Sequence, residues 1–151
     1  MSKIGLWTDS HNFPSLPLMK LSAYHKSMGD EVEMYMPINQ YDLVYASKVF
    51  SFTDDIDTDS VIQADEVKKG GTGYCINVKN GREVFDNSKN NSLPKEIEHI
   101  YPDYALYPQY KYAVGFLTRG CPRNCGFCVV GEKEGLCSKQ VADLDEFWRG
   151  Q

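Results

Sequence analysis

The chain has 151 residues, of which 42% are apolar and 25% charged, and it carries a net charge of −5. This length is enough for one hydrophobic core plus part of another, and the composition is that of an ordinary globular protein. The negative charge disfavours nucleic acid as the main partner, because binding to phosphates requires a basic surface.

The N-terminal residues show no targeting segment. The apolar stretch that precedes Asp9 is too short for a signal-peptide core or a membrane span. We therefore expect a cytoplasmic protein without a membrane partner. In that reducing compartment the five cysteines indicate metal or redox chemistry rather than disulfides.

Strand and helix patterns alternate in the N-terminal part. Helical spacing predicts a helix over residues 16–28, which Gly29 would end. Apolar or alternating runs predict strands at residues 3–7, 31–37, 42–47 and 66–68. Strand, helix, strand and strand in this order are typical of a parallel α/β sheet of the doubly wound, Rossmann-like kind.

The middle of the chain is less regular. The acidic residues 54–60 predict a loop that leads into a short helix, since carboxylates favour a helix N-terminus. The pair Asn80 and Gly81 predicts a hairpin turn. A short helical turn and a connector rich in proline and tyrosine follow, and they place a domain boundary between residues 1–108 and 109–151.

After the connector, residues 112–118 predict a new strand, and the residues from 143 onward predict the start of an amphipathic helix. A strand, a loop and a helix start are too little for a domain. We therefore expect that the rest of this domain is not in these residues, and that a continuation of this chain or a partner supplies it. The strand would then have an unpaired edge through which chains could associate.

Three cysteines directly follow that strand. Cys121, Cys125 and Cys128 have the spacing C-x-x-x-C-x-x-C, and thiolates select zinc, copper(I) or iron–sulfur clusters. Residues 104–131 contain no Asp or Glu but include Lys111, Arg119 and Arg123, a setting that offsets the negative charge of a thiolate-bound cluster. A closed structural site takes four protein ligands, so three ligands favour a metal centre with an open position.

The motif resembles the signature of the radical S-adenosylmethionine (radical SAM) enzymes, C-x-x-x-C-x-aromatic-C, with Phe127 in the aromatic position. The segments "LMKLSAYHKSMGDEVE", "KGGTGY" and "VGFLTRGCPRNCGFCVVGEKEG" are similar to a subgroup in which a cobalamin-binding-like Rossmann domain precedes the radical SAM barrel. This resemblance covers nearly the whole chain. It implies that residues 1–108 form the Rossmann-like domain and residues 109–151 the first strand, cluster loop and first helix of a partial barrel.

The resemblance also implies a chemistry. Cys121, Cys125 and Cys128 would bind a 4Fe-4S cluster whose fourth iron takes the amino and carboxylate groups of S-adenosylmethionine, and Phe127 would pack beside the adenine. An electron donor would drive reductive cleavage of this cofactor to a 5′-deoxyadenosyl radical, which abstracts hydrogen from a substrate. The substrate and the catalytic residues stay open, because later barrel strands would supply them. We therefore expect this chain to be incomplete for catalysis on its own.

Two alternatives concern the other cysteines and the first domain. Cys137 lies nine residues beyond Cys128, and the four late cysteines could form a zinc-binding module without enzymatic activity. Otherwise Cys75 and Cys137 are expected to be small apolar core residues.

A cobalamin site would require D-x-H-x-x-G in the first loop of the Rossmann-like domain. Asp9 and His11 match its start, but Pro14 stands in place of the glycine. Gly70 and Gly71 could line a cofactor tail, and a tight turn explains them equally well. We therefore expect the fold without cobalamin, and His11 as a loop residue that makes a local hydrogen bond.

Overall fold

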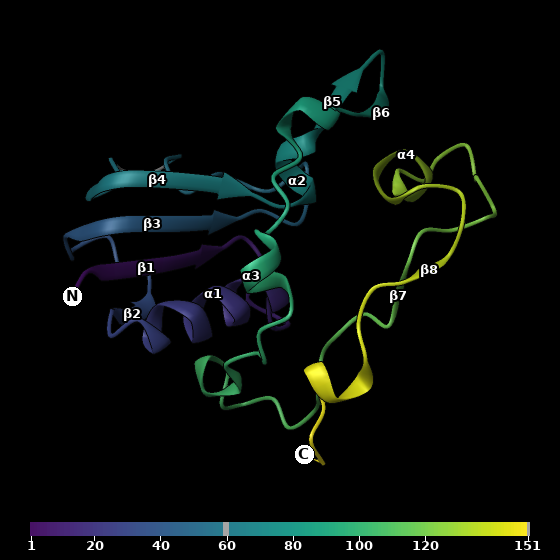
Figure 1. Cartoon of the computed structure of the whole chain (residues 1–151). Helices are drawn as coiled ribbons and strands as arrows, with labels where there is room; N and C mark the ends of the chain where they lie inside the picture. The colour runs from purple at the N-terminus through teal and green to yellow at the C-terminus, as the bar shows by residue number, and fades with distance from the viewer. Residues whose placement is uncertain (59–60, 151) are drawn as a thin grey trace.

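Four parallel strands form the central sheet of the protein (Figure 1). The computed structural model describes residues 1–58 and 61–150. The strands lie in the order β2-β1-β3-β4 and comprise β1 (Lys3–Thr8), β2 (Glu31–Met34), β3 (Tyr41–Ser47) and β4 (Ala64–Gly70). The predicted α/β fold with a parallel sheet is confirmed, and the arrangement is compatible with a Rossmann-like fold.

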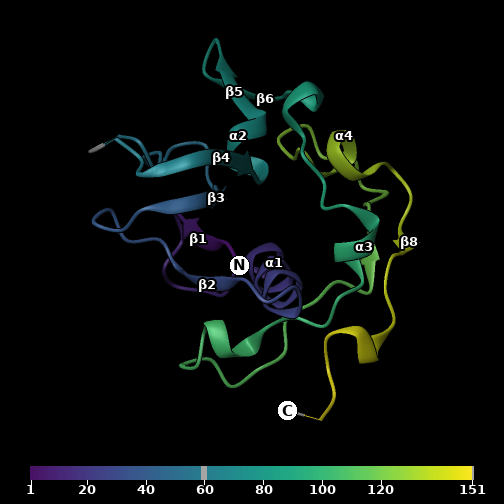
Figure 2. The same cartoon turned by 60° about the vertical axis from the view of Figure 1, so that its left-hand side comes forward.

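Helix α1 (Leu16–Ser27) covers one face of this sheet (Figures 1 and 2). Leu18 and Leu21 pack against Ile4 and Leu6 of β1, and all four side chains are buried. Gly29 ends the helix with φ of +86°, a conformation that glycine adopts without strain. The predicted helix and its end are therefore confirmed.

The other face of the sheet is covered by irregular connections. Tyr35 and Ile56, from the connections before and after β3, pack with the buried side chains of Tyr41 and Val44. The short helix expected near residues 54–60 is absent from the described residues of this connection, and Asp59 and Ser60 lie outside them. Apolar contacts from these loops replace the second helical layer of a doubly wound sheet.

The acidic stretch is held by a lysine. Lys69 of β4 forms ion pairs with Asp55 at 2.9 Å and with Asp57 at 3.1 Å, and the Tyr74 hydroxyl donates a hydrogen bond to Asp55. The single charge of Lys69 offsets part of the negative charge of the two carboxylates, and these contacts hold the loop against the sheet.

A small hairpin leaves the sheet after β4. Helix α2 (Thr72–Cys75) leads into β5 (Ile76–Lys79) and β6 (Arg82–Phe85), which pair antiparallel. Asn80 and Gly81 both have positive φ values, 52° and 75°, as a two-residue hairpin turn requires. The predicted turn is confirmed. Three short helices follow: η1 (Asn87–Lys89), α3 (Lys95–Glu98) and η2 (Tyr104–Leu106).

The connector after α3 is attached to α1. Tyr107 packs with Leu16 and Met19 in a buried cluster. Asp103 accepts hydrogen bonds from Ser22 and Lys26, each at 2.6 Å. These contacts fix the connector to α1. The domain boundary proposed at residue 108 stays a prediction.

The C-terminal region differs most from expectation. Its elements are β7 (Thr118–Arg119), α4 (Val130–Glu134), β8 (Lys139–Gln140) and η3 (Leu144–Glu146). The strand predicted over residues 112–118 is wrong for 112–117, because Gly115 lies directly against the ring of Phe147 and this stretch follows that contact instead of a sheet. The helix expected from residue 143 is the short η3, so a barrel start is not confirmed. In Figure 1 this region, green to yellow, runs beside α1 and α3.

Among the described residues, no helix combines the length and apolar composition needed to cross a bilayer.

Candidate metal centre

The three cysteines of the motif lie on one loop between β7 and α4, here called the cysteine loop (residues 120–129). Cys125 and Cys128 are exposed and Cys121 is half-buried. All three thiols are free. Within the loop, the Cys128 N–H donates to the Cys125 carbonyl at 3.0 Å, and Asn124 adopts a positive φ of 44°. The segment is therefore a series of turns with little internal bonding.

The structure does not bring the thiols together as a ligand set. Over the described ranges, no group of three or more Cys, His, Asp or Glu side chains is arranged to hold a metal ion. The donor chemistry nevertheless fits a thiolate-bound centre, since three soft ligands lie within eight positions and none is in a disulfide. Binding would require the exposed turns to close around the metal.

The base of the cysteine loop is better ordered than its tip. β7 pairs with β8 through Thr118 and Arg119, and the Cys121 N–H donates to the Gly135 carbonyl at 3.1 Å. Gly120 has φ of +90°, and a Cβ atom there would lie well under 3.0 Å from the Cys137 carbonyl oxygen. Close packing against residue 137 therefore requires the glycine at position 120.

Glu134 is the residue at this base that the sequence motif does not reveal. Its carboxylate pairs with the Arg119 guanidinium at 2.9 Å and accepts the Gly120 N–H at 3.2 Å. Arg119 is therefore neutralised by an acid that lies outside the acid-free window. Glu134 precedes a glycine at the end of a short helix, and only this weak signal could have singled it out.

Phe127 projects into solvent from the tip of the loop and is 89% exposed. The contact with an adenine that we expect for Phe127 stays a prediction, and its exposed ring is free to make one. No core contact accounts for an aromatic side chain here, because the ring contributes nothing to the three buried clusters.

The two remaining cysteines differ from each other. Cys75 is 1% exposed, its thiol donates to the carbonyls of Gly71 and Lys89, and burial raises its pKa. It is the core residue that was predicted. The same prediction is wrong for Cys137, which is exposed, because β8 brings it to the surface beside Gly120 instead of into a core.

The cysteine loop is linked to the carboxyl end of the sheet. Lys133 of α4 donates a hydrogen bond to the Thr72 hydroxyl at 2.6 Å, and Thr72 begins α2 directly after β4. Figures 1 and 2 both show α4 beyond this end of the strands. Parallel α/β sheets bind their ligands on that side.

Of the motif residues at the carboxyl end of the sheet, Asp9 is occupied by internal contacts and, in the part of the chain that the structure describes, His11 is not. Asp9 accepts hydrogen bonds from the N–H groups of Val49 at 2.8 Å and Phe50 at 3.0 Å, and from the Thr53 hydroxyl. His11 is exposed, and no hydrogen bond to it is formed within the described residues. The local bond expected for His11 is therefore wrong.

Gly71 has φ of +99° and lies against the Lys48 backbone. Contact with Lys48 accounts for this glycine, which the sequence assigned either to a turn or to a cofactor tail.

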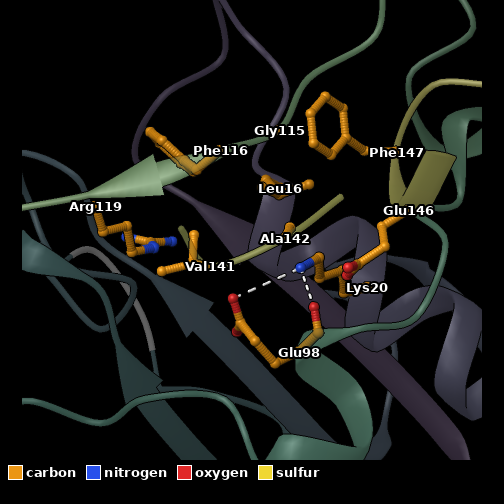
Figure 3. A pocket seen from close by; sticks show the side chains of 10 residues that line it. All are labelled: Leu16, Lys20, Glu98, Gly115, Phe116, Arg119, Val141, Ala142, Glu146 and Phe147. Atoms are coloured by element: carbon orange, nitrogen blue, oxygen red, sulfur yellow. Dashed lines mark hydrogen bonds and ion pairs between the residues drawn. The ribbon is translucent and has the colours of Figure 1, made fainter. Parts of the chain in front are cut away.

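A small pocket separates the two parts of the chain (Figure 3). Lys20 and Glu98 line it from the sheet side, and Arg119 and Glu146 from the C-terminal region. The ammonium group of Lys20 forms an ion pair with Glu98 at 3.6 Å and donates to the Glu98 carbonyl. Because these charges are already paired and no cysteine lines the pocket, it is a junction and not part of the candidate metal centre.

No protein-family model, no curated protein and no solved structure matches this chain.

Proposed function

We propose that the chain is a radical SAM protein, or the N-terminal part of one, in which Cys121, Cys125 and Cys128 bind a 4Fe-4S cluster. The observation that carries the proposal is the set of three free thiols with C-x-x-x-C-x-F-C spacing on one loop. A Rossmann-like domain over residues 1–108 and the start of a barrel over residues 109–151 belong to the same proposal. So does a cytoplasmic location, in agreement with five free cysteines.

The chain's residues divide the work as follows. The three thiolates hold the metal, and Phe127 provides an apolar surface for the adenine of S-adenosylmethionine. When bound and reduced, a cluster held by these thiolates would supply the electron for cleavage of S-adenosylmethionine to methionine and a 5′-deoxyadenosyl radical. The partners are therefore this cofactor and an electron donor, and the substrate is unassigned.

Closing the loop around a cluster costs few existing bonds. Inside the cysteine loop, the Cys128 N–H donates to the Cys125 carbonyl, whereas the strand pair and the contacts at the base lie outside the turns that would move. A Cβ atom at Gly126 would meet no atom within 4 Å, so the tip has room to move. In this proposal Cys125 and Cys128 move toward Cys121, whose N–H is held by the Gly135 carbonyl at the base of the loop.

The test is anaerobic reconstitution with iron and sulfide, followed by iron analysis and EPR of the reduced protein. We expect about four irons per chain, and Cys121→Ser, Cys125→Ser or Cys128→Ser should each abolish the cluster. Cys137→Ser is the matched control and should keep it. Equal loss of metal from Cys137→Ser and Cys125→Ser would contradict the proposal.

The second candidate is a zinc-binding module that uses Cys137 as a fourth ligand. It is favoured by one contact, the approach of the Cys137 carbonyl to Gly120 beside Cys121. A four-thiolate zinc site is closed and structural. It predicts that protein purified without added iron or sulfide holds one zinc per chain, and that Cys137→Ser loses this zinc. The cluster proposal predicts instead that Cys137→Ser keeps its metal.

A further inference from the structure

A carboxylate closes the base of the cysteine loop. Glu134, the last residue of α4, binds two successive residues on the opposite side of the loop. One oxygen pairs with the Arg119 guanidinium at 2.9 Å, and the other accepts the Gly120 N–H at 3.2 Å. The next peptide adds a third bond, from the Cys121 N–H to the Gly135 carbonyl at 3.1 Å.

The setting makes these bonds stronger than those of a surface ion pair. The side chains of Glu134 and Arg119 are 20% and 33% exposed, so solvent screens their attraction only in part. The guanidinium also lies over the ring of Phe116, 4.5 Å from its centre, which limits the rotation of Arg119. Hydrogen bonds that involve a charged group are shorter and stronger than neutral ones.

The position of this contact matters for the ligands. Gly120 immediately precedes the first cysteine, and Glu134 lies six residues after the last cysteine of the motif. The contact between Gly120 and Glu134 holds the two ends of the cysteine loop together. It therefore narrows the range of distances between the three thiols. Holding ligands near their bound geometry raises affinity, because less conformational entropy is lost on binding.

We propose that Glu134 is a positioning residue for the cysteine site, which keeps the loop closed at its base before any metal is bound. The role in cluster assembly rests on the proposed function, whereas the role in holding the thiols does not. Glu134 itself is not a ligand in this proposal, since both its oxygens are engaged by Arg119 and Gly120.

The experiment compares Glu134→Ala, Glu134→Gln and Arg119→Ala, all in a Cys137→Ser background, where the buried Cys75 is the remaining thiol outside the motif. Glu132→Ala is the matched control, because Glu132 is an exposed acid on the same helix and forms no ion pair among the described residues. The first readout is metal-free: titration with phenylarsine oxide, which bridges two neighbouring thiols and releases water. The second readout is iron uptake on anaerobic reconstitution.

We expect Glu134→Ala to weaken arsenical binding about tenfold, as loss of a partner that orients metal ligands does. Glu134→Gln keeps an oxygen for the Gly120 N–H but loses the charge that holds Arg119, so it should lose about threefold. Arg119→Ala should resemble Glu134→Gln, and Glu132→Ala should match the parent. If Glu134→Ala does not fold, the arsenical affinities of Glu134→Gln and Arg119→Ala test the positioning role.

The two readouts separate the two proposals. If Glu134→Ala and Glu134→Gln bind the arsenical as tightly as Glu132→Ala, the positioning role is wrong, whatever the iron content. If the arsenical series shows the expected losses but the parent takes up no iron, the positioning role stands and the cluster proposal fails.

Discussion

Replacing Gly120 by alanine is the sharpest single test of how the cysteine loop is built. The residue has φ of +90°, and an added Cβ atom would lie well under 3.0 Å from the Cys137 carbonyl oxygen and 3.2 Å from that of Gly135. Both obstacles are backbone atoms, so they cannot move aside as a flexible side chain would. The strand pair β7–β8 must separate, or residue 120 must change its conformation.

The magnitude follows from these two alternatives. Forcing a side chain into a positive-φ conformation costs about 1–3 kcal/mol. Separating the strands instead loses the hydrogen bond from the Cys121 N–H to Gly135, worth about 1 kcal/mol. The cheaper of the two alternatives sets the destabilisation, so we expect the base of the loop to lose about 1–3 kcal/mol of stability, which is at least about a fivefold rise in its open population.

Gly126→Ala is the matched control, because Gly126 lies in the same loop, its φ is not positive, and a Cβ atom there would have open space. The assay is hydrogen exchange at the Cys121 amide in the metal-free protein, followed by iron uptake. Gly120→Ala should speed exchange and lower iron uptake, whereas Gly126→Ala should change neither. Equal behaviour of the two variants would refute the reasoning that Gly120 is required by its contact with residue 137.

Three other substitutions test separate parts of the structure. Phe127→Ala should leave the free energy of unfolding within about 0.5 kcal/mol of the parent, because the ring is exposed, and should weaken the change that S-adenosylmethionine produces in the EPR spectrum; an equal spectral change would exclude a cofactor contact. Asp103→Asn should cost about 1–2 kcal/mol: burial alone would raise the pKa of Asp103, but its hydrogen bonds from Lys26 and Ser22 hold this pKa below the ordinary 3.8. The stabilisation by the Asp103 carboxylate is thus present above pH 3.8 and is lost as the pH falls through the lower pKa of the folded state. The free energies of unfolding of parent and variant, measured with denaturant, should therefore become equal only in that acid range. Equal values at neutral pH would contradict the assignment. Asp9→Ala should speed hydrogen exchange at the Val49 and Phe50 amides, which Asp9 binds, and unchanged exchange there would show that Asp9 does not hold this loop.

The sequence by itself determined the elements whose signals are local. The run at β1, the helical spacing of α1 and the glycine at position 29 each act within a few residues, so their positions follow from the pattern. The turn at Asn80 and Gly81 is set by backbone conformation alone. The three thiols at fixed spacing were equally readable as a candidate site, but their binding of a metal stays a prediction.

Tertiary structure alone decided the C-terminal region. An apolar run becomes a strand only when a neighbouring strand pairs along its length. Within the described residues, the Leu117 carbonyl accepts the Val141 N–H at 2.9 Å, but residues 112–117 form no strand and Gly115 lies against Phe147 instead. The exposed position of Cys137 likewise follows from the pairing of β7 with β8. The engagement of Arg119 by Glu134 joins residues 15 positions apart. Such contacts depend on where distant segments meet in space, and that is a property of the packed chain, not of any local pattern.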